Sequence, residues 1–228
     1  MDLELLAGLN AERNARRAAL LVTDMTGGPG RLVRESDDFS ADPLANDFRE
    51  AFRSGRSKRI ETAEANVFIT ACLPPPRLVM IGAVHISQAL SPVARIAGFD
   101  VTIVDPRTAF ATEDRFAGIP LHADWPETVL PTLAIDRYTA LAALTHDPKI
   151  DDFALQHALE KDCFYVGALG SRKTHAKRQE RLEAAGVSAE AFARIHAPIG
   201  LAIGAVSPSE IAVSIMAEII ATLRRSAP

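Results

Sequence analysis

Residues 78–107 read LVMIGAVHISQALSPVARIAGFDVTIVDPR, and this stretch decides the fold class. The apolar run at 78–81 predicts a buried strand. Residues 85–97 predict a helix that ends at Gly98, and residues 101–104 predict a second buried strand. A strand, a helix and a strand in this order form a βαβ unit, so the sequence predicts parallel strands.

The rest of this half of the chain continues the alternation. The apolar runs 139–144 and 164–166 predict two more strands, each followed by a helical pattern. The last helix has the clearest start signal, since Ser207 is a predicted N-cap, Pro208 its first residue and Glu210 the partner in a capping box. We therefore expect an α/β fold with a Rossmann-like parallel sheet and helices on both faces.

Three prolines at 74–76 separate this pattern from the residues before it. Such a run is a stiff linker, because proline continues neither a helix nor a central strand. We expect two domains, a small N-terminal α+β region at 1–73 and the Rossmann-like domain at 74–228. The elements expected in the first region are helices at 2–17 and 42–54 and strands at 18–23, 31–34 and 64–73.

Composition narrows the class of protein. The chain has 228 residues, 48% apolar and 24% charged, with a net charge of -4, as is ordinary for a globular protein. Nucleic-acid binding needs a basic surface, so we expect no such partner. No apolar run approaches the ~20 residues of a membrane span. Cys72 and Cys163 form no CxxC motif, which favours a reducing cytoplasm and excludes a disulfide framework.

Polar and glycine-rich segments follow the predicted strands. The carboxyl ends of parallel strands share one edge of the sheet, and ligands bind in the crevice there. We therefore expect one crevice that holds a small phosphate-bearing ligand. The segments are 82–85, 105–107, 145–147, 167–173 and 196–200.

The first turn resembles an incomplete dinucleotide fingerprint. Gly82 is present, and Asp105 follows at about the distance expected of a ribose-binding acid. Val84 replaces the second glycine, so a turn without a ligand is a close alternative. Asp105 could accept hydrogen bonds from ribose or a pterin and Arg107 could bind phosphate, or the two could form only a local ion pair.

Residues 164–181 predict a stronger anion site. Gly167 and Gly170 permit a tight turn, and Ser171 caps a helix whose first residues are Arg172 and Lys173. The N-terminus of a helix offers free N–H groups and a positive dipole end. The alternative is a solvated basic face.

Other polar residues are candidates for chemistry. His146 and Asp147 could grip a ligand or move a proton, but no nearby nucleophile makes them a hydrolase triad. A metal site formed by these two with His85 matches no standard motif, so we expect no metal. Glu218 falls on a polar stripe of the last helix and is predicted to face solvent.

Taken together, these motifs resemble the XdhC/CoxI family of xanthine dehydrogenase accessory proteins. The resemblance covers about residues 78–223 in unbroken order. It rests on the segments 82–85, 101–107, 110–112, 144–147, 154–155, 165–174, 198–205 and 210–220.

The resemblance implies a non-catalytic protein that binds molybdenum cofactor, a phosphate-bearing pterin, and delivers it to a xanthine dehydrogenase-type molybdenum hydroxylase. It also makes a homodimer plausible, with a second accessory chain or a sulfur-donating enzyme as further partners. The residues expected to line the crevice, with Gly167 and Lys173 added from the turn itself, are Gly82, His85, Asp105, Arg107, His146, Asp147, Gly167, Gly170, Ser171, Arg172 and Lys173.

Two features depart from the family pattern. Val84 stands where the family usually has glycine, and the N-terminal region is short and lacks a Gly-Gly-Cys-type motif. The alternatives are therefore an NAD(P)-dependent oxidoreductase that uses the first turn, or a binding-only accessory protein that docks to the target enzyme.

Overall fold

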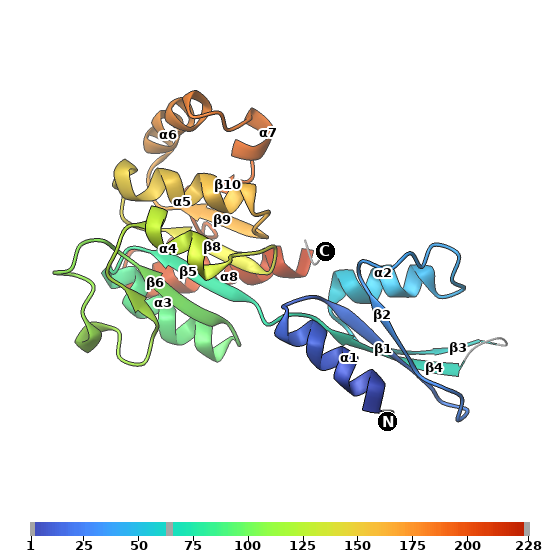
Figure 1. Cartoon of the computed structure of the whole chain (residues 1–228). Helices are drawn as coiled ribbons and strands as arrows, with labels where there is room; N and C mark the ends of the chain where they lie inside the picture. Colours follow the sequence, from blue (N-terminus) through green and yellow to red (C-terminus); the bar gives the residue numbers. More distant parts are fainter. Residues whose placement is uncertain (1–2, 63–65, 226–228) are drawn as a thin grey trace. The chain divides into compact units, whose positions relative to one another are not determined.

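The computed structural model describes residues 3–62 and 66–225, which divide between Pro74 and Pro75 into two compact units (Figure 1). The start of the helix expected at 2–17 and the first two residues of the strand expected at 64–73 lie outside the described residues. No described helix is long and apolar enough to cross a membrane.

The first unit contains a four-stranded antiparallel sheet in the order β2-β1-β4-β3. Phe48 and Phe52 of α2 are buried and contact the ring of Phe39. The sequence did not reveal β3, because its residues Lys-Arg-Ile-Glu carry little apolar pattern. The elements are α1 (Leu3–Asn14), β1 (Ala19–Asp24), β2 (Arg31–Arg34), α2 (Ala45–Ser54), β3 (Lys58–Glu61) and β4 (Asn66–Cys72).

The second unit contains a six-stranded sheet in the order β10-β9-β8-β5-β6-β7, and every pair is parallel. This confirms the expected Rossmann-like fold. A strand end was expected at 196–200, and β10 ends there, whereas β7 was not expected, since two residues are too few to form a pattern. The elements are β5 (Arg77–Ile81), α3 (His85–Ile96), β6 (Asp100–Val104), a 3-10 turn (Glu113–Arg115), β7 (Leu121–His122), α4 (Pro126–Leu133), β8 (Thr139–Ala143), α5 (Pro148–Glu160), β9 (Tyr165–Ala168), α6 (Arg172–Ala184), α7 (Ala189–Phe192), β10 (Ile195–His196) and α8 (Pro208–Arg225).

Both faces of this sheet are buried, as continuous apolar strands require. Leu78 and Met80 face one core cluster with residues of α3 and α8, whereas Val79 and Ile81 face another with residues of α4 to α7. Figure 1 shows α3 and α8 on one side of the sheet and α5 on the other. The alternating side chains of β5 therefore fix which helices cover which face.

The strand order changes direction between β5 and β8. From β5 the chain proceeds outward through β6 to β7, and then returns to β8 on the other side of β5. The crevice at such a switch point, beyond the carboxyl ends of the strands, is where ligands bind in open α/β sheets. Gly82, directly after β5, has a φ of 115°, and a Cβ there would lie 2.9 Å from Cγ2 of Thr145. Glycine therefore lets the ends of β5 and β8 approach closely.

We expect Gly82→Ala to lower the free energy of unfolding of the second unit by roughly 2–4 kcal/mol, because strained backbone and overpacking add. Gly98→Ala is the matched control, since Gly98 also has a positive φ, 85°, but open space around its Cβ position. It should cost only about 1 kcal/mol. Urea unfolding followed by the fluorescence of Trp125, the single tryptophan, measures both. Equal losses would show that the contact with Thr145 is unimportant.

Candidate functional site

The first strand-to-helix turn presents a helix end without a side-chain cap. Helix α3 begins at His85, and its N-cap, Val84, makes no capping hydrogen bond. Ser87, at the third fingerprint position, is buried and its hydroxyl donates to the carbonyl of Gly82. The turn therefore directs the positive end of α3 and its first N–H groups toward the crevice.

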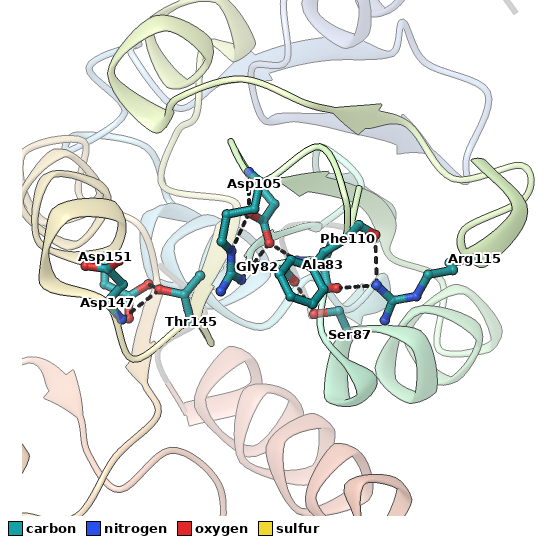
Figure 2. Close-up of polar contacts among 10 residues, drawn as sticks. Gly82, Ala83, Ser87, Asp105, Phe110, Arg115, Thr145, Asp147 and Asp151 are labelled. Atoms are coloured by element: carbon teal, nitrogen blue, oxygen red, sulfur yellow. Dashed lines mark hydrogen bonds and ion pairs between the residues drawn. The ribbon is translucent and has the colours of Figure 1, made fainter. Parts of the chain in front are cut away.

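Asp105, at the end of β6, stabilises this turn through hydrogen bonds to its carboxylate. Its carboxylate is fully buried and accepts from the N–H of Ala83 at 2.7 Å and from the backbone N–H, Nε and Nη2 of Arg107 at 2.8–2.9 Å (Figure 2). Burial raises the pKa of Asp105, but these hydrogen bonds outweigh it and hold the pKa below its ordinary value. The local pair, one of the two alternatives for Asp105 and Arg107, is thus present, and the carboxylate is already occupied.

Arg107 nevertheless remains available to a ligand. One third of its side chain is exposed, its Nη1 is not used by Asp105, and its guanidinium lies over the ring of Phe110 at 4.8 Å. The hydrogen bonds that Arg107 donates to Asp105, with smaller contributions from the charges of Asp147 and Asp151 at the end of β8, raise the pKa of Arg107.

Arg115 braces the same turn from the other side, as Figure 2 shows. Its Nη1 donates to the carbonyls of Ala83 and Phe110 at 3.0 and 2.8 Å, and its Nη2 donates to Oε1 of Gln88 at 2.9 Å. Sequence reasoning missed this residue, because a single arginine in a loop carries no motif.

A second group of polar residues lies at the end of β8. The Thr145 hydroxyl donates to Oδ1 of Asp151 at 2.7 Å and accepts from the N–H of Asp147 at 3.0 Å. Asp147 is the N-cap of α5 and accepts from the N–H of Lys149, so its main role is local. His146 is exposed with a φ of 64°, and partial burial and the charge of Arg178 lower its pKa.

A charged pocket of about 230 Å³ opens beside these residues. Asp151 and Arg178 are almost fully buried there, at 1% and 2% exposure. Burial raises the pKa of Asp151 to about 6, and burial lowers the pKa of Arg178 although nearby Asp151 and Asp152 oppose this. The residues that line the pocket are His146, Pro148, Asp151, Asp152, Lys173, Thr174, Lys177, Arg178 and Arg181.

A larger and more apolar pocket of about 370 Å³ lies on the other side of the turn between β9 and α6. Ser171 caps α6, and Gly170 has a φ of 134°, where an added Cβ would lie 3.1 Å from Cγ2 of Thr174. The adjacent cations Arg172 and Lys173 consequently line different pockets, Arg172 the apolar one and Lys173 the charged one. The residues that line the apolar pocket are Leu169, Arg172, residues 198–205, Ile211 and Ser214.

The expectation that Glu218 faces solvent is wrong. Only 15% of its side chain is exposed, and its carboxylate accepts from the Tyr165 hydroxyl at 2.6 Å and the N–H of Gly200 at 2.8 Å, with Nδ1 of His196 at 3.2 Å. Burial raises the pKa of Glu218, but these partners lower it below its ordinary value. The polar stripe of α8 suggested exposure, but the side of α8 that carries Glu218 packs against residues 196–200.

The predicted site residues fall into two neighbouring groups. Gly82, His85, Asp105 and Arg107 surround the first turn, with Asp147 across the switch point. Gly170, Ser171, Arg172 and Lys173 form the next strand-to-helix turn. Gly167 instead lies inside β9, where a Cβ would meet Ile199 and Tyr165 at 2.6 and 2.7 Å, so its smallness serves packing. Among the described residues, no group of three His, Cys, Asp or Glu is arranged to hold a metal ion.

A family model described as the XdhC Rossmann domain matches residues 78–219. The chain belongs to this family. The match covers the parallel sheet from β5 to β10 and most of α8, and so includes both turns and both pockets. It confirms the resemblance that the sequence motifs indicated.

Three curated relatives match about 70% of this chain at similar identity. The uncharacterized protein YqeB of Escherichia coli K12 is 34% identical over 167 residues, 72% of this chain and 30% of that protein. A probable xanthine dehydrogenase subunit of Bacillus subtilis 168 is 34% identical over 163 residues, 71% and 47% of the two chains. The molybdenum cofactor insertion chaperone PaoD of Escherichia coli K12 is 32% identical over 154 residues, 68% and 42%. The matches thus span between 30% and 47% of the length of these relatives.

A solved structure extends the likeness to the first unit. The crystal structure of a xanthine dehydrogenase from Bacillus halodurans matches with a TM-score of 0.67, and the match covers 98% of this chain and 66% of that one. At 24% sequence identity this likeness concerns the fold alone.

The raised pKa of Asp151 predicts a pH-dependent stability. The group binds its proton more tightly when folded, so its contribution is present at low pH and is lost as the pH rises through about 6. Between pH 4.5 and 7.5 this loss is roughly 2 kcal/mol. Asp151→Asn should remove it, whereas Asp152→Asn, which keeps the Asp151 carboxyl, should retain it. Urea unfolding at both pH values tests this, and an unchanged pH profile in Asp151→Asn would contradict it.

Proposed function

We propose that this chain binds molybdenum cofactor at the carboxyl edge of its parallel sheet and delivers it to a xanthine dehydrogenase-type molybdenum hydroxylase, without catalysing a reaction itself. The observation that carries the proposal is the pair of adjacent cations, Arg172 and Lys173, at the capped N-terminus of α6, each lining its own pocket. One relative is named a molybdenum cofactor insertion chaperone, which supports the same assignment.

The residues of the crevice suit a phosphate-bearing pterin. Its phosphate would be bound by Arg172, Lys173 and the helix N–H groups, which stabilise anions through charge and dipole together. Arg107, with unused N–H groups and an exposed edge, would add a third cation from the neighbouring strand end.

The strand order also favours a second candidate, a nicotinamide dinucleotide, because this is the usual dinucleotide-binding topology. Two features oppose it. Val84 occupies the position where glycine normally admits the pyrophosphate, and Asp105, the acid that would bind ribose, is buried and paired with Arg107. A carrier of a pterin phosphate needs neither a glycine at position 84 nor a free acid at position 105.

A carrier function also implies a protein partner. The names of two relatives refer to xanthine dehydrogenase or to cofactor insertion. We therefore propose a hydroxylase of that class as the recipient, with a homodimer, a second accessory chain or a sulfur-donating enzyme as further assemblies to be tested. Co-purification of the chain with the recipient in its cofactor-free form is the direct assay.

We expect Arg172→Ala and Lys173→Ala each to weaken binding of molybdenum cofactor about tenfold, since each removes a charge-assisted hydrogen bond of about 1.5 kcal/mol or more. Arg95→Ala is the matched control, because Arg95 is an exposed arginine at the opposite end of α3. Anaerobic calorimetry with the purified chain measures the affinities. Unchanged affinity in both site variants would refute the site.

NAD and NADP should be titrated in parallel under the same conditions. Binding of a nicotinamide dinucleotide without molybdenum cofactor would replace the carrier function by the oxidoreductase alternative. Binding of neither, together with capture of the hydroxylase, would favour the binding-only accessory protein.

A further inference from the structure

Two buried polar atoms in the charged pocket have no hydrogen-bond partner. They are Oδ2 of Asp151 and Nε of Arg178, the atoms that stand out as unsatisfied among the described residues. Both side chains are more than nine-tenths buried, and both line the same pocket. Buried polar groups in folded proteins are nearly always paired, so two unpaired atoms at one pocket call for a specific partner.

The other polar atoms of these side chains are already fixed. Oδ1 of Asp151 accepts from the Thr145 hydroxyl at 2.7 Å, and Nη2 of Arg178 donates to the carbonyl of Leu169 at 3.0 Å. Backbone hydrogen bonds from Thr145 and His146 to the Asp151 carboxyl also act to lower its pKa, although burial outweighs them. Nη1 of Arg178 lies 3.5 Å from Nδ1 of His175, which itself stacks on the ring of Phe192. The two free atoms are therefore held in place, one an acceptor and one a donor.

The neighbouring charged residues of the pocket are paired with each other. Arg181 donates from Nε and Nη2 to the two carboxylate oxygens of Asp152 at 2.6 and 3.1 Å. This rim pair lies one helical turn from Arg178 on α6 and next to Asp151 on α5. The same pocket is thus lined by a carboxylate and a guanidinium that satisfy each other, and by a carboxylate and a guanidinium that each keep one atom without a partner.

Oδ2 of Asp151 is an acceptor and Nε of Arg178 is a donor, and both belong to residues that line one pocket. A cyclic amide offers the complementary groups on one edge, because its N–H donates and its C=O accepts. We propose that Asp151 and Arg178 bind this edge of the pterin ring, with Oδ2 of Asp151 accepting from a ring or amino N–H and Nε of Arg178 donating to the ring carbonyl. The assignment rests on the cofactor-carrier function proposed above and names the part of the cofactor that enters the charged pocket.

Size and position agree with this assignment. Pockets that enclose a drug-sized ligand begin at roughly 300 Å³, so a pocket of about 230 Å³ accepts a small heterocycle but not a dinucleotide. Both free atoms are shielded from solvent, and the pocket lining also includes the long exposed side chains of Lys173 and Lys177, which can change rotamer to admit a ligand. With the pterin ring in this pocket, the adjacent Arg172 and Lys173 would bind the phosphate of the cofactor.

The test compares two variants with two matched controls in the full chain. Asp151→Leu removes the acceptor, and Arg178→Lys keeps the charge but removes the Nε donor. Asp42→Leu and Arg31→Lys make the same changes in an ion pair of the first unit that lines neither pocket. We expect each of the first two to weaken binding of molybdenum cofactor at least about tenfold and each control less than about threefold, with folding checked by thermal unfolding.

Small ligands identify the edge that is recognised. Free pterin should compete with the cofactor, whereas 2,4-diaminopteridine, which replaces the carbonyl acceptor by an amino donor, should not. Guanosine monophosphate carries the same amide edge on a purine, so stronger competition by it than by pterin would overturn the pterin assignment in favour of a guanine nucleotide.

The remaining outcomes separate the two proposals. If the wild-type chain binds molybdenum cofactor but the Asp151 and Arg178 variants match their controls, the edge assignment is wrong, the free atoms serve only an internal water, and the carrier function stands. If the chain binds pterin through Asp151 but not the complete cofactor, the carrier function fails and the edge assignment stands. Binding of neither ligand overturns both.

Discussion

A single buried carboxylate holds the first strand-to-helix turn of the parallel sheet together. Asp105, from the end of β6, accepts the N–H of Ala83 after β5 and three N–H groups of Arg107. A fully buried carboxylate is stable only when its oxygens are saturated in this way. Because its partners come from two neighbouring strand ends, the shape of the turn, the start of α3 and the position of Arg107 all depend on this one group.

Much of the fold could be predicted from sequence, because its main signals are local. Apolar runs followed by glycine marked the strand ends, and proline and serine marked helix starts such as Ser207. What failed depended on contacts between distant residues. Glu218 looked solvent-exposed from its helix alone, and only the packing of α8 against Tyr165 and Gly200, 53 and 18 residues away, shows that it is a structural acceptor.

The site shows the same division. Arg172 and Lys173 could be found because a glycine, a cap and cations stand together in the sequence. Asp151 and Arg178 could not, since they stand far apart in the chain and neither belongs to a motif. For Asp105 the sequence left two alternatives, a contact to ribose or pterin and a local ion pair, and the structure contains the ion pair with Arg107 together with a hydrogen bond from the Ala83 amide. Spacing indicates where a residue lies, but burial decides whether a ligand can reach it.

The arrangement of rigid and exposed groups suits a protein that must release what it binds. The turn is fixed by buried hydrogen bonds from Asp105 and Arg115, so it needs no rearrangement to accept a ligand. The cations at the pocket rims, Arg172 and Lys173, are exposed, so they attract an anion over a distance yet bind it within reach of water and competing ions. An enzyme gains rate by enclosing its substrate away from water. Enclosure would slow release from a carrier, because every contact that buries the ligand must be broken before transfer. A crevice with exposed cations and a turn already fixed by hydrogen bonds needs fewer such contacts to be broken.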